Sequence, residues 1–389
     1  MLLNVGPCLR VSVTKLFVAV SSFLIIPIIL FYNFGPVDSV SAALDSAVKQ
    51  TSTPSDHEIP PIPSACLESR PRTSSNPQLQ PTLAPALSPD DLLCRQVNVN
   101  ATGIPKLFHQ SWKTTELPSK FDRWSKTCRR MHPDWEWVLW TDDDNHKLVK
   151  TYFPWLEETY LGLPGPIYRA DFTRNLYMYM FGGVYADPDL ECLRPMAEAL
   201  EPYRIRVVNT TDIATEERHR PLAVFGRLGS DESFEHSIPN AWMASSPRHP
   251  FFVLPIKYAQ AEVKKSKNYP HKLWYFVPSA EQLTGPIALR KSILRWKASL
   301  EDMWSEIVLL PSELIYPFSW KTPGLSGWVC STLSDRFDED KCKERLELDK
   351  KGSLTLTFWS HTHEGTTSSE KNIEAAFILQ RDYTSVPPV

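Results

Sequence analysis

An uninterrupted apolar segment lies near the start of the chain, from Leu16 to Phe34. Its nineteen residues, LFVAVSSFLIIPIILFYNF, include no charged side chain. This length is close to the roughly 20 residues that cross a bilayer, and it exceeds the apolar core of about 7–15 residues in cleaved signal peptides. The pattern therefore predicts a transmembrane anchor over residues 16–34, with a cleaved signal peptide as the alternative.

The charges on either side of this segment predict its orientation. Arg10 and Lys15 precede it, whereas the first charged residue after it is Asp38. Because positively charged flanks stay on the cytosolic side of a membrane, residues 1–15 are expected to form a cytosolic tail. The rest of the chain is then lumenal, and under either alternative it enters the secretory pathway.

Polar residues and prolines dominate the segment that follows. Residues 35–102 contain the stretch HEIPPIPSACLESRPRTSSNPQLQPTLAPALSPDD and have no sustained apolar period. Such a composition cannot bury enough apolar surface to offset the entropy lost on ordering. We therefore expect a disordered, Pro/Ser-rich stem over residues 35–102, and one folded domain over residues 103–389.

The pattern of an α/β fold begins at Gly103, in the string GIPKLFHQSW. Short buried strands are predicted over Lys106–His109 and Trp135–Trp140, with a helical pattern between them over Lys120–Arg130. A strand, a crossover helix and a second strand are typical of a parallel sheet with right-handed connections. The expected fold class is α/β, with a Rossmann-type arrangement in a single domain.

A second helix is predicted over Ile167–Phe181. Asp171 and Arg174 are three positions apart in it, so the acid and the base lie on one face. Gly182-Gly183 then ends the helix, because glycine tolerates a left-handed cap. A solvated i,i+3 ion pair on this face is one interpretation of the two residues.

Two aspartates follow the next predicted strand. Val184–Ala186 has the pattern of a short strand, and Asp187-Pro188-Asp189 comes directly after it. Ligands of open α/β sheets bind at the carboxyl ends of strands. Paired carboxylates supply hard oxygen ligands to Mg²⁺ or Mn²⁺, together with phosphate oxygens. The residues predict a divalent cation site, with an ordinary turn as the alternative.

Charge and cysteine content narrow the range of partners and surroundings. The formal net charge of −3 provides no basic field for a nucleic-acid backbone, so nucleic acid is not an expected partner. Six of the 7 cysteines follow the apolar segment, where an oxidising compartment allows disulfides. Cys330 and Cys342 bracket a short polar stretch and are the first pair expected. Sequons at Asn100 and Asn209 agree with a lumenal location.

Several strings along the chain occur in a characteristic order: IPKLFHQSWKT, HPDWEWVLWTDDD, YRADFTRNLYMYMFGGVYADPD, IPNAWMASSPRHPFF, TGP and FWSHTHEGT. In this order the chain resembles glycosyltransferase family 32 from about Gly103 to His363. The Arg-x-Asp…Gly-Gly-x-Tyr-x-Asp-x-Asp segment is the most specific part. The resemblance implies a GT-A-like fold, a nucleotide-sugar donor, Mn²⁺ (or Mg²⁺) dependence and retention of the anomeric configuration. It also implies a single-pass type II protein of the Golgi membrane.

The same resemblance assigns roles to four residues. Asp187 and Asp189 would contact the metal and the nucleotide-sugar, with Asp189 as the direct ligand. Asp171 and Arg174 would hold the donor sugar hydroxyls and the diphosphate. Elementary chemistry agrees, because carboxylates accept hydrogen bonds from hydroxyls and a guanidinium binds phosphate oxygens bidentately.

Further candidates come from the outer strings. His363, with His361 as the alternative, corresponds to the C-terminal histidine that closes the metal site or contacts the diphosphate in the family. Asn240, together with Gly285, is expected to shape the donor or acceptor pocket.

His109 and Trp112 are candidates for nucleotide binding, because they lie in FHQSW at the expected nucleotide edge of the domain. An aromatic ring there could stack on the nucleobase. Packing in the core is the alternative for both, since this chain has 13 tryptophans and most of them must serve the core.

These expectations combine into one predicted function: a metal-dependent, retaining transferase that moves a hexose, with mannose from GDP-mannose expected first, to a glycan or glycolipid acceptor. Transfer of galactose or N-acetylglucosamine from a UDP-sugar, and non-catalytic glycan binding, are the alternatives. The sequence departs from the family at Pro188, where many relatives have a bulkier apolar residue. It also has no second apolar span near the C-terminus, which argues against a sphingolipid acceptor.

Overall fold

Strands with apolar side chains on both faces form the centre of the protein. In β4 (Glu136–Trp140), Val138 and Trp140 belong to one hydrophobic core, and Trp137 and Leu139 belong to another. Successive side chains of a strand point to opposite faces, so a strand covered on both sides needs a continuous apolar run. The two cores therefore lie on opposite faces of one sheet.

The computed structural model describes residues 82–95, 103–210, 220–268, 278–298, 305–319, 329–332, 334, 336–360 and 376–378. Its central sheet has six strands in the order β10-β8-β9-β5-β2-β4. Neighbours in the sheet run parallel, except that β9 is antiparallel to both β5 and β8. The other five strands are β10 (Glu306–Leu310), β8 (Leu222–Gly226), β9 (Trp242–Ser245), β5 (Gly183–Ala186) and β2 (Leu107–Ser111).

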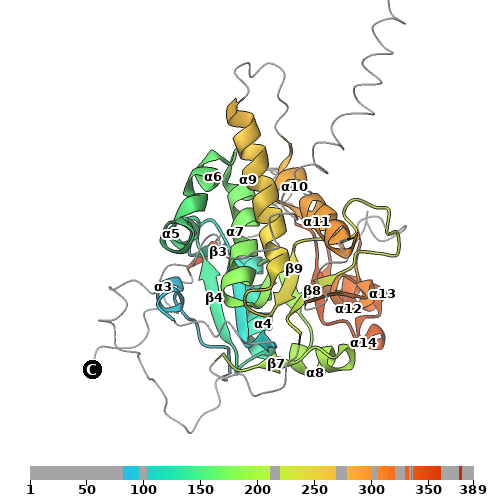
Figure 1. Ribbon diagram of the computed structural model, residues 1–389. Helices are drawn as coiled ribbons and strands as arrows, with labels where there is room; N and C mark the ends of the chain where they lie inside the picture. The colour runs from blue at the N-terminus through green and yellow to red at the C-terminus, as the bar shows by residue number, and fades with distance from the viewer. Residues whose placement is uncertain are drawn as a thin grey trace, which may run out of the picture.

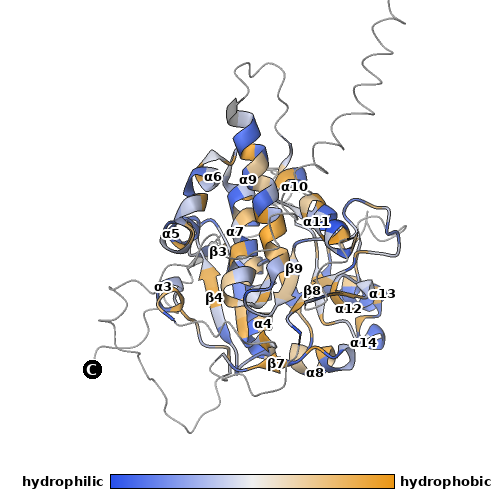
Figure 2. Ribbon diagram, viewed as in Figure 1, coloured by the Kyte–Doolittle hydropathy of each residue, from blue (hydrophilic) through white to orange (hydrophobic). Residues whose placement is uncertain are grey.

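Helices cover both faces of this sheet and complete a three-layer α/β architecture, as Figure 1 shows. One core includes side chains of α5 (Asp142–Tyr152), α7 (Pro166–Phe181), α9 (Val253–Asn268) and α11 (Pro286–Ala298). The other core includes side chains of α4 (Ser119–Met131), α8 (Met196–Leu200), α12 (Ser312–Ile315) and α13 (Glu339–Leu346). In Figure 2, β4 and β9 are hydrophobic and the outlying α13 and α14 (Leu348–Lys351) are largely hydrophilic.

Small elements surround this body. Three two-stranded sheets pair β1 (Ile104–Pro105) with β7 (Val207–Val208), β6 (Leu190–Cys192) with β11 (Thr355–Thr357), and β3 (Glu116–Pro118) with β12 (Ala376–Ile378). The remaining helices are α3 (Pro89–Leu93), α6 (Glu157–Gly162), α10 (Ala280–Leu283) and the 3₁₀ turns Pro154–Leu156, Glu201–Tyr203 and Pro250–Phe252.

The α/β elements expected from the sequence around the candidate site are confirmed. β2 and β4 pair in parallel and are connected through α4, as the strand–helix–strand pattern predicted. Helix α7 begins one residue before the expected start and ends at the expected Phe181. Strand β5 follows it directly.

Glycine is required where α7 turns into β5. Gly182 has φ 64°, and a Cβ there would lie 2.6 Å from the carbonyl oxygen of Ser245. Gly183 has φ 88°, and a Cβ there would lie 2.4 Å from the carbonyl oxygen of Leu107. Any side chain would collide with neighbouring strands, so this turn fixes the close packing of β5 beside β2 and β9.

The start of the described domain differs from the expected boundary at residue 103. Residues 82–95, which composition assigned to the stem, pack onto the domain: Leu92 and Leu93 are buried, and Ala86 bridges to Trp137 beside β4. Ser88 caps the short helix α3, and Pro89 occupies its first turn. Burial of Leu92 and Leu93 is thus enough to attach this segment to the domain, although the residues around them are mostly polar.

The predicted cytosolic tail, the transmembrane anchor and most of the predicted stem lie outside the described residues. Within the part of the chain that the structure describes, no helix is both long and apolar enough to cross a membrane.

Two disulfides lie within the described residues on the α4 side of the sheet. Cys330–Cys342 is the pair that the sequence predicted. Cys128–Cys192 joins α4 to β6, a pairing that the sequence left open among the possible connectivities. Because β6 begins one residue after Asp189, this second disulfide fixes the strand that leaves the aspartate pair.

Candidate functional site

A tight turn at the carboxyl end of β5 carries the two aspartates. The Asp187 backbone N–H donates to the carbonyl of Ala241 at 2.9 Å, and the Asp187 carbonyl accepts the N–H of Leu190 at 3.0 Å. Pro188 lies within this turn, at a position where a fixed φ is compatible with the bend. The backbone is therefore held at both ends, and the departure from the family pattern at Pro188 leaves both carboxylates in the turn.

Arg174 joins the middle of α7 to this turn. Its guanidinium lies 3.0 Å from Asp171 Oδ1 and 3.3 Å from Asp187 Oδ1. It also donates to the carbonyl of Asn240 at 2.8 Å and lies over the ring of Tyr185, 4.6 Å from the ring centroid. Burial by itself would lower the pKa of Arg174, but Asp187, Tyr185 and Asp171 together raise it above its usual value. The group therefore remains a cation.

This geometry excludes one of the two interpretations of Arg174. The i,i+3 pair with Asp171 exists, but it is buried, with the two side chains 6% and 8% exposed, so it is not a solvated ion pair. The guanidinium is engaged by two carboxylates and a carbonyl, and its Nε atom has no hydrogen-bond partner. In this arrangement Arg174 holds Asp171 and Asp187, and its role at the diphosphate stays a prediction.

Asp171 lies in a closely packed corner with the two residues expected to shape a pocket. Asn240 Nδ2 donates to Asp171 Oδ1 at 2.9 Å. Gly285 approaches from the start of α11, where a Cβ would lie 3.0 Å from Asp171 Oδ2 and 2.8 Å from the Glu281 Cα. The structure thus brings Asn240 and Gly285 together at Asp171, and glycine is needed for this approach.

Asp189 is held from a different part of the chain. Ser360 donates two hydrogen bonds to Asp189 Oδ2, from its hydroxyl at 2.7 Å and from its backbone N–H at 3.2 Å. Burial raises the pKa of Asp189, and the bonds from Ser360 oppose this shift. Ser360 belongs to the FWSHTH string, but sequence reasoning considered only the histidines of that string.

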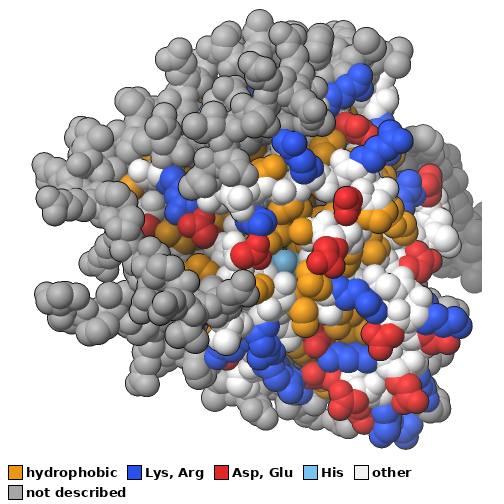
Figure 3. Space-filling model, turned by 90° about the horizontal axis from the view of Figure 1, so that it is seen from below, with side chains coloured by type: hydrophobic (Ala, Val, Ile, Leu, Met, Phe, Trp, Pro, Cys, Tyr) orange, Lys and Arg blue, Asp and Glu red, His pale blue; other side chains and the backbone are white. Residues whose placement is uncertain are grey.

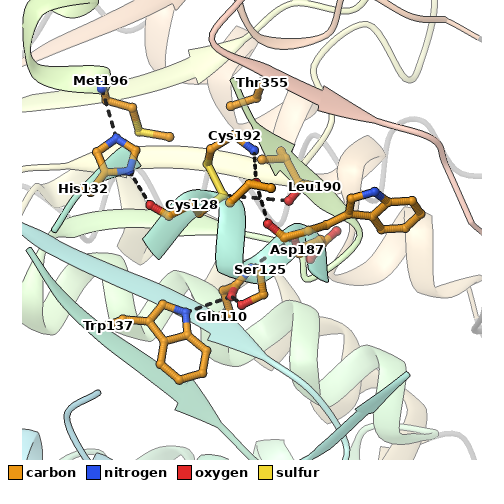
Figure 4. The surroundings of a disulfide bond; sticks show 12 residues. Gln110, Ser125, Cys128, His132, Trp137, Asp187, Leu190, Cys192, Met196 and Thr355 are labelled. Atoms are coloured by element: carbon orange, nitrogen blue, oxygen red, sulfur yellow. Dashed lines mark hydrogen bonds between the residues drawn. A yellow bond between two sulfur atoms is a disulfide. The ribbon is translucent and has the colours of Figure 1, made fainter. Parts of the chain in front are cut away.

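Tyr185 and Gln110 support Asp187, and sequence analysis identified neither of them. The Tyr185 hydroxyl donates to Asp187 Oδ1 at 2.7 Å. Gln110 Nε2 lies 3.5 Å from the Asp187 carbonyl, while its Oε1 accepts from Ser125 and from Trp137 Nε1, as Figure 4 shows. The signal that could have identified Gln110 is its place at the carboxyl end of β2, directly beside the end of β5.

His109, expected at the nucleotide, lies in the core instead. It is 0% exposed and stacks on Tyr177 and Trp140. Its two ring nitrogens contact the Gly182 carbonyl at 3.0 Å and Trp140 Nε1 at 3.1 Å. Burial lowers the pKa of His109 to about 4, so the ring is neutral at physiological pH. The core alternative therefore holds for this residue.

Trp112 follows β2 at the expected edge of the sheet and is partly buried. Its backbone N–H donates to the Trp140 carbonyl at 2.9 Å, and its ring contacts Phe121 edge to face with centroids 5.2 Å apart. Nucleotide stacking by Trp112 stays a prediction. His361 and His363 lie outside the described residues.

The donor set is suited to a divalent cation that is also bound by ligand oxygens. Asp171 and Asp187 pair with the Arg174 guanidinium, which also acts electrostatically on Asp189, and the four groups together have a formal charge of −2 when all are ionised. The Asp187 side chain is 28% exposed, so this carboxylate is reachable. No group of three or more His, Cys, Asp or Glu side chains in the described ranges could hold a metal by itself. Mg²⁺ and Mn²⁺ need only one or two carboxylates when phosphate oxygens complete the coordination.

The surface of the described residues that Figure 3 shows has charges of both signs. On the face shown in Figure 3, acidic and basic side chains alternate around apolar ones over the described residues.

Residues 118–206 match the family described as "Glycosyltransferase sugar-binding region containing DXD motif". This range contains α7, β5 and both aspartates of the turn. The matched region therefore includes Asp171, Arg174 and the Asp187–Asp189 turn.

Several curated fungal proteins are similar to this chain. Inositol phosphoceramide mannosyltransferase 3 of Schizosaccharomyces pombe is 40% identical over 111 residues, covering 28% of this chain and 31% of that protein. Mannosyl phosphorylinositol ceramide synthase SUR1 of Saccharomyces cerevisiae is 31% identical over 200 residues, covering 50% of this chain and 44% of that protein. Initiation-specific alpha-1,6-mannosyltransferase of the same yeast is 31% identical over 101 residues, covering 24% and 21%.

The matches span half or less of the length of these relatives, from 31% to 50% for the inositol phosphoceramide enzymes. Among solved structures, the PaToxG glycosyltransferase has a TM-score of 0.33 and 14% identity, covering 51% of this chain and 72% of that chain. The match over residues 118–206 confirms, for that region of the chain, the resemblance to this glycosyltransferase family that the motifs predicted.

Proposed function

We propose that this protein is a metal-dependent glycosyltransferase that transfers mannose from GDP-mannose. The observation that carries the proposal is the cluster of Asp171, Asp187 and Asp189 around Arg174, beside the carboxyl end of β5 and inside the matched sugar-binding region. The relatives named above are mannosyltransferases or a mannosyl synthase, which supports mannose as the transferred sugar. A GT-A-like fold is compatible with the mixed α/β sheet and with a site at strand ends.

The roles of the residues follow from their positions. Asp189 and Asp187 would hold Mn²⁺ or Mg²⁺, which when bound neutralises the diphosphate of the leaving nucleotide. Asp171 would accept hydrogen bonds from donor sugar hydroxyls, because its orientation is fixed by Asn240 and Arg174. Arg174 would orient Asp171 and Asp187 through its ion pairs with both, and the diphosphate charge would be balanced mainly by the metal ion.

The acceptor we propose is a glycolipid with an inositol phosphate head group. Four of the relatives whose names state this acceptor match 48–51% of this chain and one matches 28%, whereas the initiation-specific alpha-1,6-mannosyltransferase matches 24% of it. This proposal goes against the expectation drawn from the missing second apolar span. Anomeric retention, a Golgi location and a type II orientation remain part of the proposal, together with the lumenal location of Asn209 in an exposed turn after β7.

The test is a matrix of donors and acceptors. The purified full chain would be incubated with Mn²⁺ and GDP-mannose, UDP-galactose or UDP-N-acetylglucosamine. Each donor would be offered with an inositol phosphoceramide or an oligomannose acceptor, and products would be identified by mass spectrometry. We expect mannosylated inositol phosphoceramide, and no product when the metal is removed by a chelator. Product from a UDP-sugar alone would contradict the donor, and product on the oligomannose alone would contradict the acceptor.

A further inference from the structure

The pairing of two short strands brings a distant segment to Asp189. β6 and β11 are antiparallel, with Thr357 opposite Leu190 and Thr355 opposite Cys192. In an antiparallel pair, residues that follow one strand lie beside residues that precede the other. The chain after Thr357 is therefore delivered to Asp189, although the two segments are about 170 residues apart in sequence.

The chain turns sharply at Trp359, one residue before the contact. Trp359 has φ 52°, a left-handed conformation that is unfavourable for a bulky residue. Its indole Nε1 donates to the Phe318 carbonyl at 3.0 Å, and its ring lies 5.4 Å from that of Tyr316. Its backbone N–H donates to Thr357 Oγ1 at 3.3 Å. These contacts hold the turn, and strained backbone held in this way is concentrated at functional sites.

The turn presents two donors to one oxygen of the carboxylate. The Ser360 side chain and backbone N–H both bond to Asp189 Oδ2, and Ser360 is 1% exposed. Neither bond uses Oδ1. Two bonds to one oxygen restrict rotation of the carboxylate, because hydrogen bonds to an ionised group are short and directional.

Asp187 and Asp189 are thus fixed by different parts of the fold. Asp187 is held by Tyr185 and Arg174 from the α7 side of the sheet. No ion pair joins Asp189 to a Lys or Arg of the described residues, and the bonds to its carboxylate come from Ser360 on the β11 side. The groups that orient metal-binding side chains commonly control metal affinity.

We propose that Ser360 is a positioning residue of the sugar-transfer site, which orients Asp189 for the cation. This inference rests on the proposed function. It also explains the left-handed backbone of Trp359, which directs the Ser360 N–H toward Asp189. The segment after β11 is then part of the site through Ser360, independently of either histidine that follows.

The experiment compares three variants of the full chain. Ser360→Ala removes one bond to Asp189, Ser360→Thr keeps a hydroxyl, and Ser353→Ala is the matched control. Ser353 is a buried serine that precedes β11, and its hydroxyl donates to the Glu313 carbonyl at 2.6 Å, away from the site. Mn²⁺ affinity would be measured by calorimetric titration, with the melting temperature of the metal-depleted proteins recorded in parallel.

Ser360→Ala should weaken Mn²⁺ binding about tenfold or more, the range for groups that orient metal ligands. Ser360→Thr should bind within a few-fold of the parent, and Ser353→Ala should bind like the parent even if its melting temperature falls. Equal Mn²⁺ affinity of Ser360→Ala and the parent would overturn the positioning role of Ser360 and leave the proposed metal-dependent function standing. Failure of the parent protein to bind Mn²⁺ would overturn both this inference and the metal-dependent function.

Discussion

Arg174 Nη1 lies 3.3 Å from Asp187 Oδ1 and so connects the middle of α7 to the turn that carries the aspartate pair. The guanidinium is buried, and each of its neighbours also belongs to the site. A buried cation of α7 thus holds two of the site's carboxylates in place.

Replacing Arg174 by Gln should destabilise the protein strongly. The change leaves the buried Asp171 and the partly exposed Asp187 without their cation, and breaking a buried pair such as Arg174–Asp171 costs about 3–5 kcal/mol. The free energy of unfolding would be measured by denaturant titration. Arg123→Gln is the matched control, because the Arg123 side chain is 55% exposed in its pair with Glu339 and such pairs contribute about 0–1 kcal/mol. Equal losses in the two variants would refute the role of Arg174.

Gln110→Glu tests the support of the Asp187 backbone. The substitution keeps the shape and the acceptor for Ser125 and Trp137, but it replaces the amide donor that faces the Asp187 carbonyl with an oxygen. We expect a loss of at least about 1–3 kcal/mol in unfolding free energy, because an unsatisfied buried polar group costs that much and a buried carboxylate costs more. Gln282→Glu is the control, since Gln282 belongs to an exposed capping box in which Glu serves equally well. An unchanged stability of Gln110→Glu would remove the claim.

Acid should destabilise the fold through His109. In the unfolded chain its pKa is near 6.5, whereas burial holds the folded value at about 4, so the unfolded state binds more protons between these values. Stability is therefore lost as pH falls from 6.5 toward 4, by about 2 kcal/mol at pH 5 from this residue. Denaturant titrations at pH 7 and pH 5 would measure this loss in the parent and in His109→Gln. The pH dependence should be smaller in the variant, and an equal dependence would contradict the assignment.

The two disulfides should differ in their contribution to stability. Cys128–Cys192 closes a segment of sequence separation 64, whereas Cys330–Cys342 closes one of 12. On the loop-entropy account these values correspond to about 4 and about 3 kcal/mol. Replacing both cysteines of each pair by serine and measuring thermal unfolding checks the order. Only loss of Cys128–Cys192, which lies close to Asp187 in Figure 4, should also reduce transfer activity. A greater loss of stability in the Cys330–Cys342 variant than in the Cys128–Cys192 variant would contradict this ranking.

Local patterns were sufficient to predict the elements that build the site. Strands β2 and β4 are apolar runs of consecutive residues, and the helix before Gly182-Gly183 ends at two glycines. Hydrophobic periodicity and the conformational freedom of glycine were therefore enough to predict these elements. The short-range disulfide Cys330–Cys342 was predictable for the same reason.

Contacts between distant segments were not predictable in this way. The pairing of β6 with β11 brings Ser360 to Asp189, and no local pattern indicates that register. The burial of His109 depends on Tyr177 and Trp140, which lie on separate elements. Arg174 was correctly placed on a face with Asp171, but whether that face was solvated depended on β5 and β9.

The central claim is that Asp189 binds a cation required for transfer, and replacing Asp189 by Asn tests it most directly. Asparagine keeps the size of the side chain and an oxygen acceptor for Ser360, but it deletes the charge that holds the cation. The rate of transfer should therefore fall roughly a thousandfold or more, which corresponds to a loss of several kcal/mol of transition-state stabilisation at about 1.36 kcal/mol per tenfold. Asp134→Asn, a change at a side chain that is 60% exposed and pairs with Lys106, is the control.

The measurement is the Mn²⁺-dependent shift in melting temperature, recorded together with mannosyl transfer for the parent and both variants. The account predicts a Mn²⁺ shift in the parent and in Asp134→Asn and none in Asp189→Asn, because only a protein that binds the cation is stabilised by it. Near-parental transfer and an unchanged Mn²⁺ shift in Asp189→Asn would contradict the proposed site.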